Sequence, residues 1–263
     1  MPDVKKKVFI VTGASAGIGA ALVRALAKEG CSVVMIARRK ERLEALAAEL
    51  APLPGERLVL SGDIRQAATS QAAVALALAQ FGRLDVTINN AGVGQRSLLS
   101  AAPVEDLGAV WETNVMGPLH LIQAALPHMK ESGSGQIVNI SSIVSQRPML
   151  LSGMYNATKT ALNFLSRSLR MELLGEDIVV SLVYVGLTNT EFPEARLGRK
   201  GGSFLNLRGV PPAKVAWAVL KAVKSRRREV YVSWYDWVFV HANRLFPRTT
   251  DFFFARFGRY QKR

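Results

Sequence analysis

Residues 7–19 read KVFIVTGASAGIG, in which an apolar run passes through a glycine-rich turn directly into a helical pattern. The apolar run predicts a buried β-strand over 7–12, and the amphipathic stretch IGAALVRALAKEG predicts the helix that follows. Glycines let a backbone turn approach a pyrophosphate closely, and the free N–H groups at the start of a helix attract negative charge. The segment therefore indicates a nucleotide-binding turn, although a tight turn that binds nothing has the same pattern.

Six more β-like runs follow along the chain, separated by helical or irregular stretches. They are rich in Val and Ile and several are apolar almost throughout, which is typical of strands buried on both faces of a parallel sheet. The expected strands are 32–37 (SVVMIA), 57–62 (RLVLSG), 84–89 (LDVTIN), 136–141 (QIVNIS), 177–183 (DIVVSLV) and 229–233 (EVYVS). This alternation predicts an α/β, Rossmann-like, doubly wound fold with a seven-stranded, mostly parallel sheet and helices on both faces.

The alternating pattern continues to about residue 233 and predicts a single domain over 1–233. Within it, the segment 186–212 holds eight glycine and proline residues, and we expect a substrate loop or lid there. The last 30 residues, 234–263, do not belong to the alternation. We therefore expect them to form a separate C-terminal extension that is basic and aromatic.

The composition is that of an ordinary globular protein, with 49% hydrophobic and 21% charged residues. The single cysteine, Cys31, excludes a disulfide within the chain. The N-terminal sequence lacks the apolar stretch of a signal peptide, and no segment has the roughly 18 uninterrupted apolar residues that a membrane span needs. We therefore expect a cytoplasmic protein.

The residues after the second expected strand favour NADP(H) over NAD(H). An acidic residue at this position would accept a hydrogen bond from the 2′-hydroxyl of the adenosine ribose. The sequence instead has Arg38, Arg39 and Lys40. Arginine suits a 2′-phosphate both by its charge and by its planar fork of donors. A solvated basic helix start is the alternative, but basic residues are unfavourable at a helix N-terminus.

Two further segments at expected strand ends are candidates for contact with the nucleotide. Asp63 follows the third strand and could accept a hydrogen bond from the adenine amino group. The residues Asn89-Asn90-Ala91-Gly92 follow the fourth strand, where a turn of small residues would leave room for the cofactor. Aspartate and asparagine are common at strand ends, so neither segment is specific on its own.

Tyr155 and Lys159 lie four residues apart in an expected helix and therefore share a helix face. A free tyrosine has a pKa of about 10, and a nearby ammonium group lowers it, so the pair can act as an acid and base. Ser142 lies 13 residues earlier, just after an expected strand, at the sheet edge where ligands bind. Asn114 stands in an expected helix, although asparagine is a mediocre helix former.

Five motifs thus follow one another in order: TGASAGIG, NNAG, Asn114, Ser142 and YNATK. In this order and at these intervals they resemble the short-chain dehydrogenase/reductase family in its commonest form, over about residues 5–190. The resemblance implies that Tyr155 exchanges a proton with the substrate oxygen. It implies that Lys159 holds the nicotinamide ribose and lowers the pKa of the tyrosine. It also implies that Ser142 orients the substrate carbonyl, and that Asn114 kinks its helix and holds a water in a proton relay.

The resemblance also implies where a nicotinamide cofactor binds: at the glycine-rich turn, after the next three strands, on the tyrosine helix and in the loop after the sixth strand. The expected cofactor-binding residues are Gly13, Ser15, Gly17, Ile18, Gly19, Arg38, Arg39, Asp63, Ile64, Asn90, Ala91, Gly92, Tyr155, Lys159, Gly186, Thr188 and Thr190. Ser142 and Tyr155 would bind the substrate, and we expect no metal ion at the site.

Two positions complicate the family pattern. Ser141 and Ser142 are adjacent, and the resemblance favours Ser142 as the partner of Tyr155, with Ser141 as the alternative. The loop after the sixth strand usually begins with Pro-Gly, but this chain has Val185-Gly186. Because proline would fix φ near about −65°, its absence leaves the geometry of this loop open.

The net charge of +14 is concentrated at the C-terminal end of the chain. Residues 196–263 hold 16 of the 34 Lys and Arg residues but only 3 of the 20 Asp and Glu residues, and 231–260 hold 11 of the 20 aromatic residues. Aromatic and basic residues together favour a segment that lies at a membrane surface. A substrate lid and a subunit interface are the alternatives. We expect no nucleic acid partner, because no nucleic-acid motif accompanies the charge.

We therefore expect an enzyme, an NADP(H)-dependent oxidoreductase that interconverts a carbonyl and an alcohol by hydride transfer. A non-catalytic NADP(H)-binding sensor or scaffold on the same fold is the alternative. Residues expected near the substrate are mostly apolar, which favours an apolar or lipid-like small molecule: Ile143, Val144, Met149, Leu150 and Met154. We also expect a homodimer or homotetramer, associated with the cytosolic surface of a membrane if the extension binds lipid.

Overall fold

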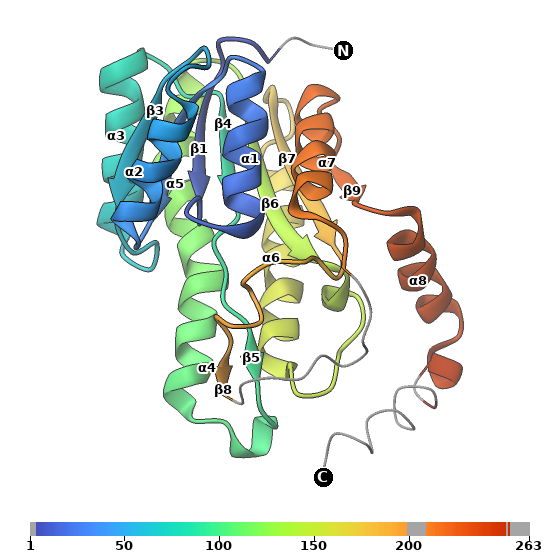
Figure 1. Cartoon of the computed structure of the whole chain (residues 1–263). Coiled ribbons are helices and arrows are strands. Elements are labelled where there is room, and N and C mark those ends of the chain that lie inside the picture. Colours follow the sequence, from blue (N-terminus) through green and yellow to red (C-terminus); the bar gives the residue numbers. More distant parts are fainter. Residues whose placement is uncertain (1–3, 199–208, 251, 253–263) are drawn as a thin grey trace.

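A parallel β-sheet of seven strands forms the centre of the structure, a computed structural model that describes residues 4–198, 209–250 and 252 (Figure 1). The strands of this sheet are β1 (Val8–Thr12), β2 (Ser32–Ala37), β3 (Arg57–Ser61), β4 (Val86–Asn89), β6 (Gly135–Ser142), β7 (Ile178–Val185) and β9 (Glu229–Tyr231). Two short strands, β5 (Gln95–Arg96) and β8 (Leu197–Gly198), form a separate parallel pair. The described α-helices are α1 (Gly17–Lys28), α2 (Lys40–Leu50), α3 (Ala67–Phe81), α4 (Val104–Trp111), α5 (Gly117–Glu131), α6 (Gly153–Glu172), α7 (Pro212–Lys224) and α8 (Trp234–Leu245).

The strand order is β3-β2-β1-β4-β6-β7-β9, and each neighbouring pair is parallel. The chain therefore runs outward from β1 to β3, returns to place β4 on the other side of β1, and then runs outward in the opposite direction. In such open sheets the crevice at the carboxyl ends of the strands, where the order reverses, is where ligands bind. The expected seven-stranded, doubly wound α/β fold is confirmed, and the strand bounds differ from the expected ones by at most two residues.

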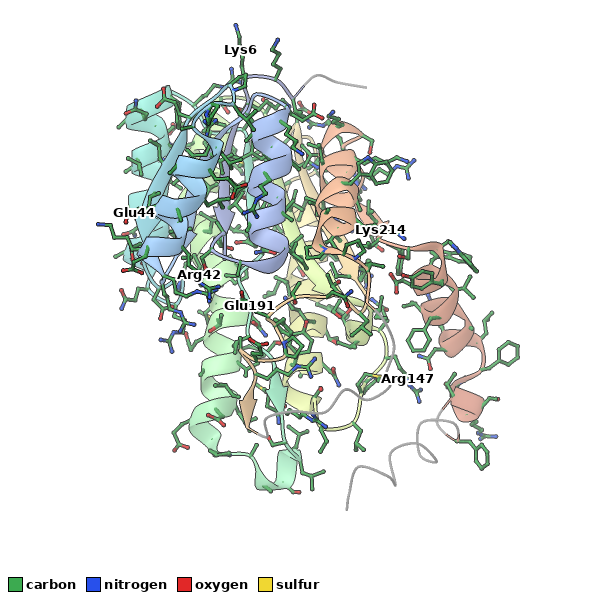
Figure 2. The ribbon with its side chains drawn as sticks, in the orientation of Figure 1. Lys6, Arg42, Glu44, Arg147, Glu191 and Lys214 are labelled. Carbon is green, nitrogen blue, oxygen red and sulfur yellow. The ribbon has the colours of Figure 1, made fainter. Side chains whose placement is uncertain are left out.

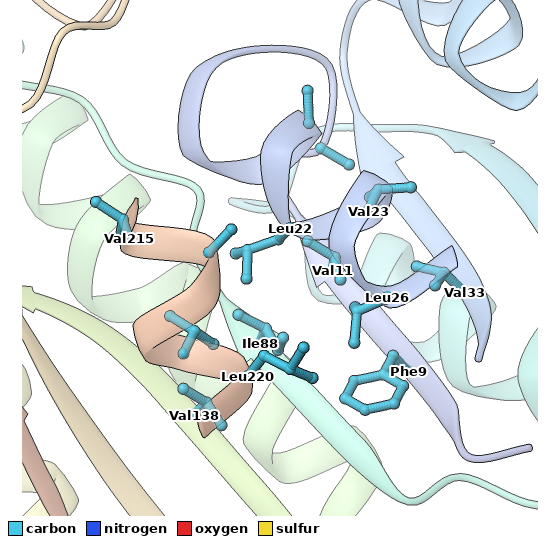
Figure 3. Packing of buried hydrophobic residues seen from close by; sticks show 14 of the residues in the cluster. Phe9, Val11, Leu22, Val23, Leu26, Val33, Ile88, Val138, Val215 and Leu220 are labelled. Carbon is cyan, nitrogen blue, oxygen red and sulfur yellow. The ribbon is translucent and has the colours of Figure 1, made fainter. Parts of the chain in front are cut away.

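Two apolar clusters, one on each face of the sheet, hold the helices in place. The first joins the sheet to α1, α2 and α7, and Figure 3 shows Leu22 and Leu26 of α1 packed with Leu220 of α7 over Phe9 of β1. The second joins the opposite face to α3, α5 and α6. Because both faces are covered, β1 is buried at every position, which explains its continuous apolar sequence. Full burial of a Val, Ile, Leu or Phe side chain, as in β1 and α1, contributes roughly 1.5–3 kcal/mol to folding.

The segment that follows β7 crosses the carboxyl edge of the sheet. Its beginning and its end meet, because Thr188 forms an isolated parallel bridge with Val210. Between them, β8 pairs with β5, and the Leu197 amide donates to the Gly94 carbonyl at 3.0 Å. The expected substrate loop 186–212 thus lies over the ligand-binding edge in its described parts, while 199–208 lie outside the described residues.

The C-terminal extension begins with α8, which lies beside the sheet next to β9 (Figure 1). Three of its residues, Asp236, Val240 and Asn243, are buried, so one face of the helix is docked on the rest of the molecule. Positions 251 and 253–263 of the extension are outside the described part of the chain. The division into a domain over 1–233 and an extension over 234–263 stays a prediction.

Candidate active site

The glycine-rich turn between β1 and α1 has a backbone that requires glycine. Gly13 and Gly17 have φ values of 67° and 53°, in the left-handed region that favours glycine. Gly19 has a different reason, since a Cβ there would lie 2.1 Å from the carbonyl oxygen of Gly13. The turn is fixed from the side by Asn90, whose amide donates to the carbonyls of Thr12 at 2.8 Å and Gly13 at 3.3 Å.

This turn fits the pyrophosphate of a dinucleotide. α1 begins after Ala16, which has no side chain that could cap the helix, and the first turn contains no acidic residue. The backbone N–H groups of that turn can therefore bind an anion, with the favourable end of the helix dipole behind them. Across the turn, Thr190 approaches Gly17 so closely that a Cβ at Gly17 would lie 3.2 Å from its side chain. The phosphate groups would thus lie between two loops that the fold brings together.

Basic residues at the start of α2 line the adenosine side of the turn. Arg39 donates to the Ser15 hydroxyl at 3.2 Å, which links the expected 2′-phosphate site to the glycine-rich turn. Arg42 lies one helical turn further on, and sequence reasoning missed it. The signal was available, because residues three apart share a helix face. Both arginines contact Glu191 from the loop after β7.

The residues after β3 and β4 also lie at this edge. Asp63 holds Arg65 through its backbone N–H and its guanidinium group, and these contacts hold the pKa of the Asp63 carboxyl below its usual value. An adenine amino group would therefore compete with Arg65 for this carboxylate. Ile64, directly after Asp63, is buried. The segment that follows β4, Asn90 to Gly92, lies against the glycine-rich turn at Gly13.

The structure distinguishes the two adjacent serines at the end of β6. Ser141 is buried and donates to the side-chain oxygen of Asn163 on α6 at 2.6 Å, so its hydroxyl is used inside the molecule. Ser142 lies close enough to Tyr155 to act on its hydroxyl, where it lowers the pKa, and it donates to the carbonyl of Val185 at 3.0 Å. The geometry therefore supports Ser142 as the partner of the tyrosine, as the resemblance implies.

Tyr155 lies in the first turns of α6 with a strongly shifted acidity. Desolvation by its surroundings raises the pKa of Tyr155 to about 12, while the hydrogen bond with Ser142 and the positive charge of Arg196 act in the opposite direction. The tyrosine is therefore protonated at neutral pH and is ready to donate a proton to a substrate oxygen. Its ring packs against Phe192, with the two ring centroids 5.6 Å apart.

Lys159 lies one turn after Tyr155 and is buried. Its ammonium group donates to the carbonyl of Ile140 at 2.8 Å and lies 5.9 Å from the centre of the Tyr155 ring. Burial lowers the pKa of Lys159 to about 8. Lys159 is expected to lower the pKa of Tyr155. In the chain alone, however, desolvation dominates, and the net shift of the Tyr155 pKa is upward.

Asn114 lies in a π-helical turn, Glu112–Met116, between α4 and α5. This turn is the distortion expected at Asn114. The buried side chain accepts a hydrogen bond from the Val93 amide and donates to the Val93 carbonyl and the Thr158 hydroxyl. Both amide hydrogens are therefore used within the protein, so a water in a proton relay would need another group of Asn114, such as its backbone carbonyl.

The loop after β7 is braced by α8. A Cβ on Gly186 would lie 2.2 Å from a carboxylate oxygen of Asp236, so the two residues are in tight contact. Asp236 is buried, and desolvation raises the pKa of its carboxyl. Thr188 lies two residues further on and donates to the Gly186 carbonyl at 3.2 Å. Where the family pattern has a proline before Gly186, this chain thus has a helix from the C-terminal extension packed on the glycine itself.

Besides Arg42, sequence reasoning missed three further residues of this site, Phe192, Arg196 and Asp236. Phe192 contacts Tyr155, and the guanidinium carbon of Arg196 lies 5.8 Å from the centre of the Phe192 ring. Arg196 is partly buried, and desolvation lowers its pKa. All three come from segments outside the strand and helix alternation, so no local pattern indicates their position. Within the described residues, no group of three or more His, Cys, Asp or Glu side chains could hold a metal ion.

These features place the molecule among the Rossmann-fold oxidoreductases. A comparison with protein-family models then gives the family, since residues 7–199 match the model described as short chain dehydrogenase. The chain belongs to the short-chain dehydrogenase family, as the motifs implied.

Known proteins of similar sequence or structure agree with this membership. A protein of Arabidopsis thaliana named 11-beta-hydroxysteroid dehydrogenase-like 3 is 32% identical over 256 residues, covering 95% of this chain and 81% of the relative. The structure of an alcohol dehydrogenase from Thermococcus sibiricus, complexed with 5-hydroxy-NADP, is 29% identical with a TM-score of 0.76, covering 86% of this chain and 96% of that one. A short chain dehydrogenase/reductase from Burkholderia phymatum in complex with NAD is 23% identical with a TM-score of 0.85, covering 95% and 97%, and shows the shared fold.

Proposed function

We propose that this enzyme is an NADP(H)-dependent oxidoreductase that interconverts a carbonyl and an alcohol, with Tyr155 as the general acid and base. The observation that carries the proposal is the grouping of Ser142, Tyr155 and Lys159 at the carboxyl edge of the sheet, beside the glycine-rich turn. A purely binding protein has no physical need for a buried lysine next to a desolvated tyrosine. The non-catalytic sensor or scaffold is therefore the weaker candidate.

The bound cofactor supplies or accepts the hydride, and the side chains of this chain handle the proton. Tyr155, protonated at neutral pH, donates its proton to the carbonyl oxygen as that oxygen becomes an alkoxide. The Ser142 hydroxyl, which donates to the Val185 carbonyl in the chain alone, donates instead to the substrate carbonyl oxygen and orients the substrate. Lys159 holds a positive charge near Tyr155. One of its three N–H groups donates to the Ile140 carbonyl, and the other two can donate to the nicotinamide ribose.

The arginines at the start of α2 support NADP(H) as the preferred cofactor. Arg39 and Arg42 already bind a carboxylate, that of Glu191, at the position expected for a 2′-phosphate. Two guanidinium groups on one helix face favour a dianionic phosphate over the neutral 2′-hydroxyl of NAD(H).

The substrate that fits this site best is apolar or lipid-like around its reacting carbonyl. Phe192 covers Tyr155 on one side. Leu150 lies just before α6, and Met154 lies in its first turn. A relative named for a hydroxysteroid dehydrogenase supports a hydrophobic substrate. Arg196 adds one positive charge near Tyr155.

The replacement Tyr155→Phe tests the mechanism. It removes only the hydroxyl and should lower kcat for NADPH-driven carbonyl reduction by about a hundredfold or more, the usual contribution of a positioned acid. Tyr235→Phe, which removes a hydroxyl from the exposed surface of α8, is the matched control and should leave kcat unchanged. Full turnover by Tyr155→Phe would rule out the proposed acid, and no turnover of any carbonyl by the wild type would favour the scaffold.

We also propose that α8 attaches the enzyme to an anionic membrane surface. Its outer face exposes Trp234, Tyr235 and Trp237, Phe246 is exposed just after the helix, and the extension is basic. Such a face suits the headgroup region, where aromatic rings and basic side chains are both favourable. Among the described residues, no helix is long and apolar enough to cross a membrane. The attachment that we propose is peripheral.

Flotation with vesicles that contain phosphatidylserine tests this attachment. Asp236 contacts Gly186, so the test variant leaves it in place and replaces Trp234, Trp237 and Phe246 by serine. We expect the wild type to float and the triple variant to stay in solution. A Val104→Ser variant, which alters an exposed apolar residue on α4, should still float. Equal behaviour of wild type and triple variant would refute the attachment.

A second exposed apolar face, on α6 and just after it, supports the expected homodimer or homotetramer. Phe164, Met171 and Leu174 are each about two-thirds exposed, which is unusual for large apolar side chains. A second copy of the chain is the occupant that we propose for this face. Light scattering of Phe164→Glu should show monomers where the wild type shows dimers or larger assemblies.

A further inference from the structure

The carboxylate of Glu191 binds both arginines that we assign to the 2′-phosphate. Its two oxygens lie 3.0 and 2.8 Å from the Arg42 guanidinium, and one lies 3.3 Å from that of Arg39. Figure 2 shows Arg42 and Glu191 side by side, although 149 residues separate them in the sequence. The contact therefore joins the adenosine side of the site to the loop after β7.

Glu191 occupies a special place in that loop. The preceding residue, Thr190, lies over the glycine-rich turn at Gly17, and the following residue, Phe192, packs on the ring of Tyr155. One short segment thus spans the site from the arginines to the catalytic tyrosine. Whatever holds or releases Glu191 acts directly on the wall of the substrate site.

We propose that Glu191 is a cofactor-responsive latch that holds Arg39 and Arg42 until the 2′-phosphate of NADP(H) displaces it. The inference rests on the proposed preference for NADP(H) and adds a residue that sets it. A phosphate dianion carries more charge and more acceptor oxygens than one carboxylate, so it replaces Glu191 on the guanidinium groups. NAD(H) has only a hydroxyl at this position and leaves the latch closed.

The exposure of the three side chains suits an exchangeable contact. Arg39, Arg42 and Glu191 are each about half exposed, with side-chain exposures of 47%, 48% and 49%. Solvent-exposed ion pairs are weak, so a ligand can displace such a contact at modest cost. Displacement frees the Phe192 side of the loop at the moment when the cofactor binds, which couples cofactor binding to the opening of the substrate wall.

Calorimetric titration of the full-length protein with 2′,5′-ADP and with 5′-AMP tests the latch, because the two probes differ only in the 2′-phosphate. Glu191→Gln removes the competing charge and keeps the size of the side chain. We expect it to tighten 2′,5′-ADP binding about two- to fivefold, the range of one exposed ion pair, and to leave 5′-AMP binding within twofold. Glu194→Gln, with the same charge change on an exposed residue of the same loop, is the control and should change neither constant by more than twofold.

The outcomes separate this inference from the function on which it rests. If the wild type binds both probes equally, the preference for NADP(H) fails. If the wild type prefers 2′,5′-ADP but Glu191→Gln leaves that constant unchanged or weakens it, the latch is refuted. A similar gain for both probes, or the same gain in Glu194→Gln, also refutes the latch, because it indicates a general effect of charge.

Discussion

At the scale of single residues, the main property of the site is that the pKa values of Tyr155 and Lys159 are shifted in opposite directions. Burial raises the pKa of the tyrosine to about 12 and lowers that of the lysine to about 8. Each shift favours the neutral form of its side chain, as desolvation always does. The chain alone therefore holds a protonated tyrosine, which suits proton donation during carbonyl reduction better than proton removal during alcohol oxidation.

The lysine shift predicts how stability changes with pH. In the folded chain Lys159 loses its proton near pH 8, but in the unfolded chain it keeps the proton to about pH 10.5. The unfolded state thus binds more protons between these values, so the free energy of unfolding should rise with pH there, by on the order of 2 kcal/mol. Above about pH 10 the unfolded tyrosine ionises first, and the free energy should fall again.

Urea unfolding of the cofactor-free protein at pH 7, 8, 9 and 10 measures this dependence. Lys159→Met removes the titrating group and should abolish the rise between pH 8 and 10. Lys28→Met, which alters an exposed lysine at the end of α1, should keep it. A rise of the same size in Lys159→Met would show that another group is responsible.

At the scale of elements, the contact between Gly186 and Asp236 joins the loop after β7 to α8. A methyl group at Gly186 would lie 2.2 Å from the Asp236 carboxylate, so Gly186→Ala must displace the loop or the helix. We expect this replacement to lower the free energy of unfolding by about 1–3 kcal/mol, as overpacking commonly does. Urea unfolding measures the change, and cofactor titration should show weaker binding.

A double variant and a neutral glycine serve as controls for this prediction. Adding Asp236→Ala to Gly186→Ala should restore part of the lost stability, because the clash is gone. Gly108→Ala on α4, where a Cβ meets nothing within 4 Å, should be neutral or stabilising. Additive effects of Gly186→Ala and Asp236→Ala would show that the two residues do not interact.

At the scale of the whole molecule, the cofactor should stabilise the fold, because its site joins both halves of the sheet. A ligand that binds only the folded state at a hundred times its dissociation constant adds about 2.7 kcal/mol. We expect NADP+ to raise the thermal unfolding midpoint more than NAD+ at the same concentration, and Arg42→Gln to reduce that difference. Differential scanning fluorimetry measures both, and equal shifts for the two cofactors in the wild type would contradict the prediction.

Sequence reasoning recovered the whole-molecule architecture because the sheet is buried on both faces. β1 is almost entirely apolar for this reason, and the turn at Gly13 carries its own local signal. The motif residues Ser142, Tyr155 and Lys159 likewise follow recognisable patterns at fixed intervals along the chain.

The rest depends on contacts between distant segments that no local pattern encodes. Glu191 meets Arg42 across 149 residues, and Asp236 meets Gly186 only because α8 folds back on the sheet edge. The sign of the Tyr155 shift is also a tertiary property, since it depends on how much protein surrounds the ring.

Asp236 lies between Trp234 and Trp237 in α8, so the intrinsic fluorescence of these two tryptophans can respond to changes at the site. Both indoles are exposed on α8, while the aspartate between them contacts the loop that carries the expected nicotinamide site. A movement of that loop would shift the helix and change the polarity around both rings. Their fluorescence emission should therefore change when a cofactor binds at the expected nicotinamide site. Cofactor binding can then be measured without an added dye.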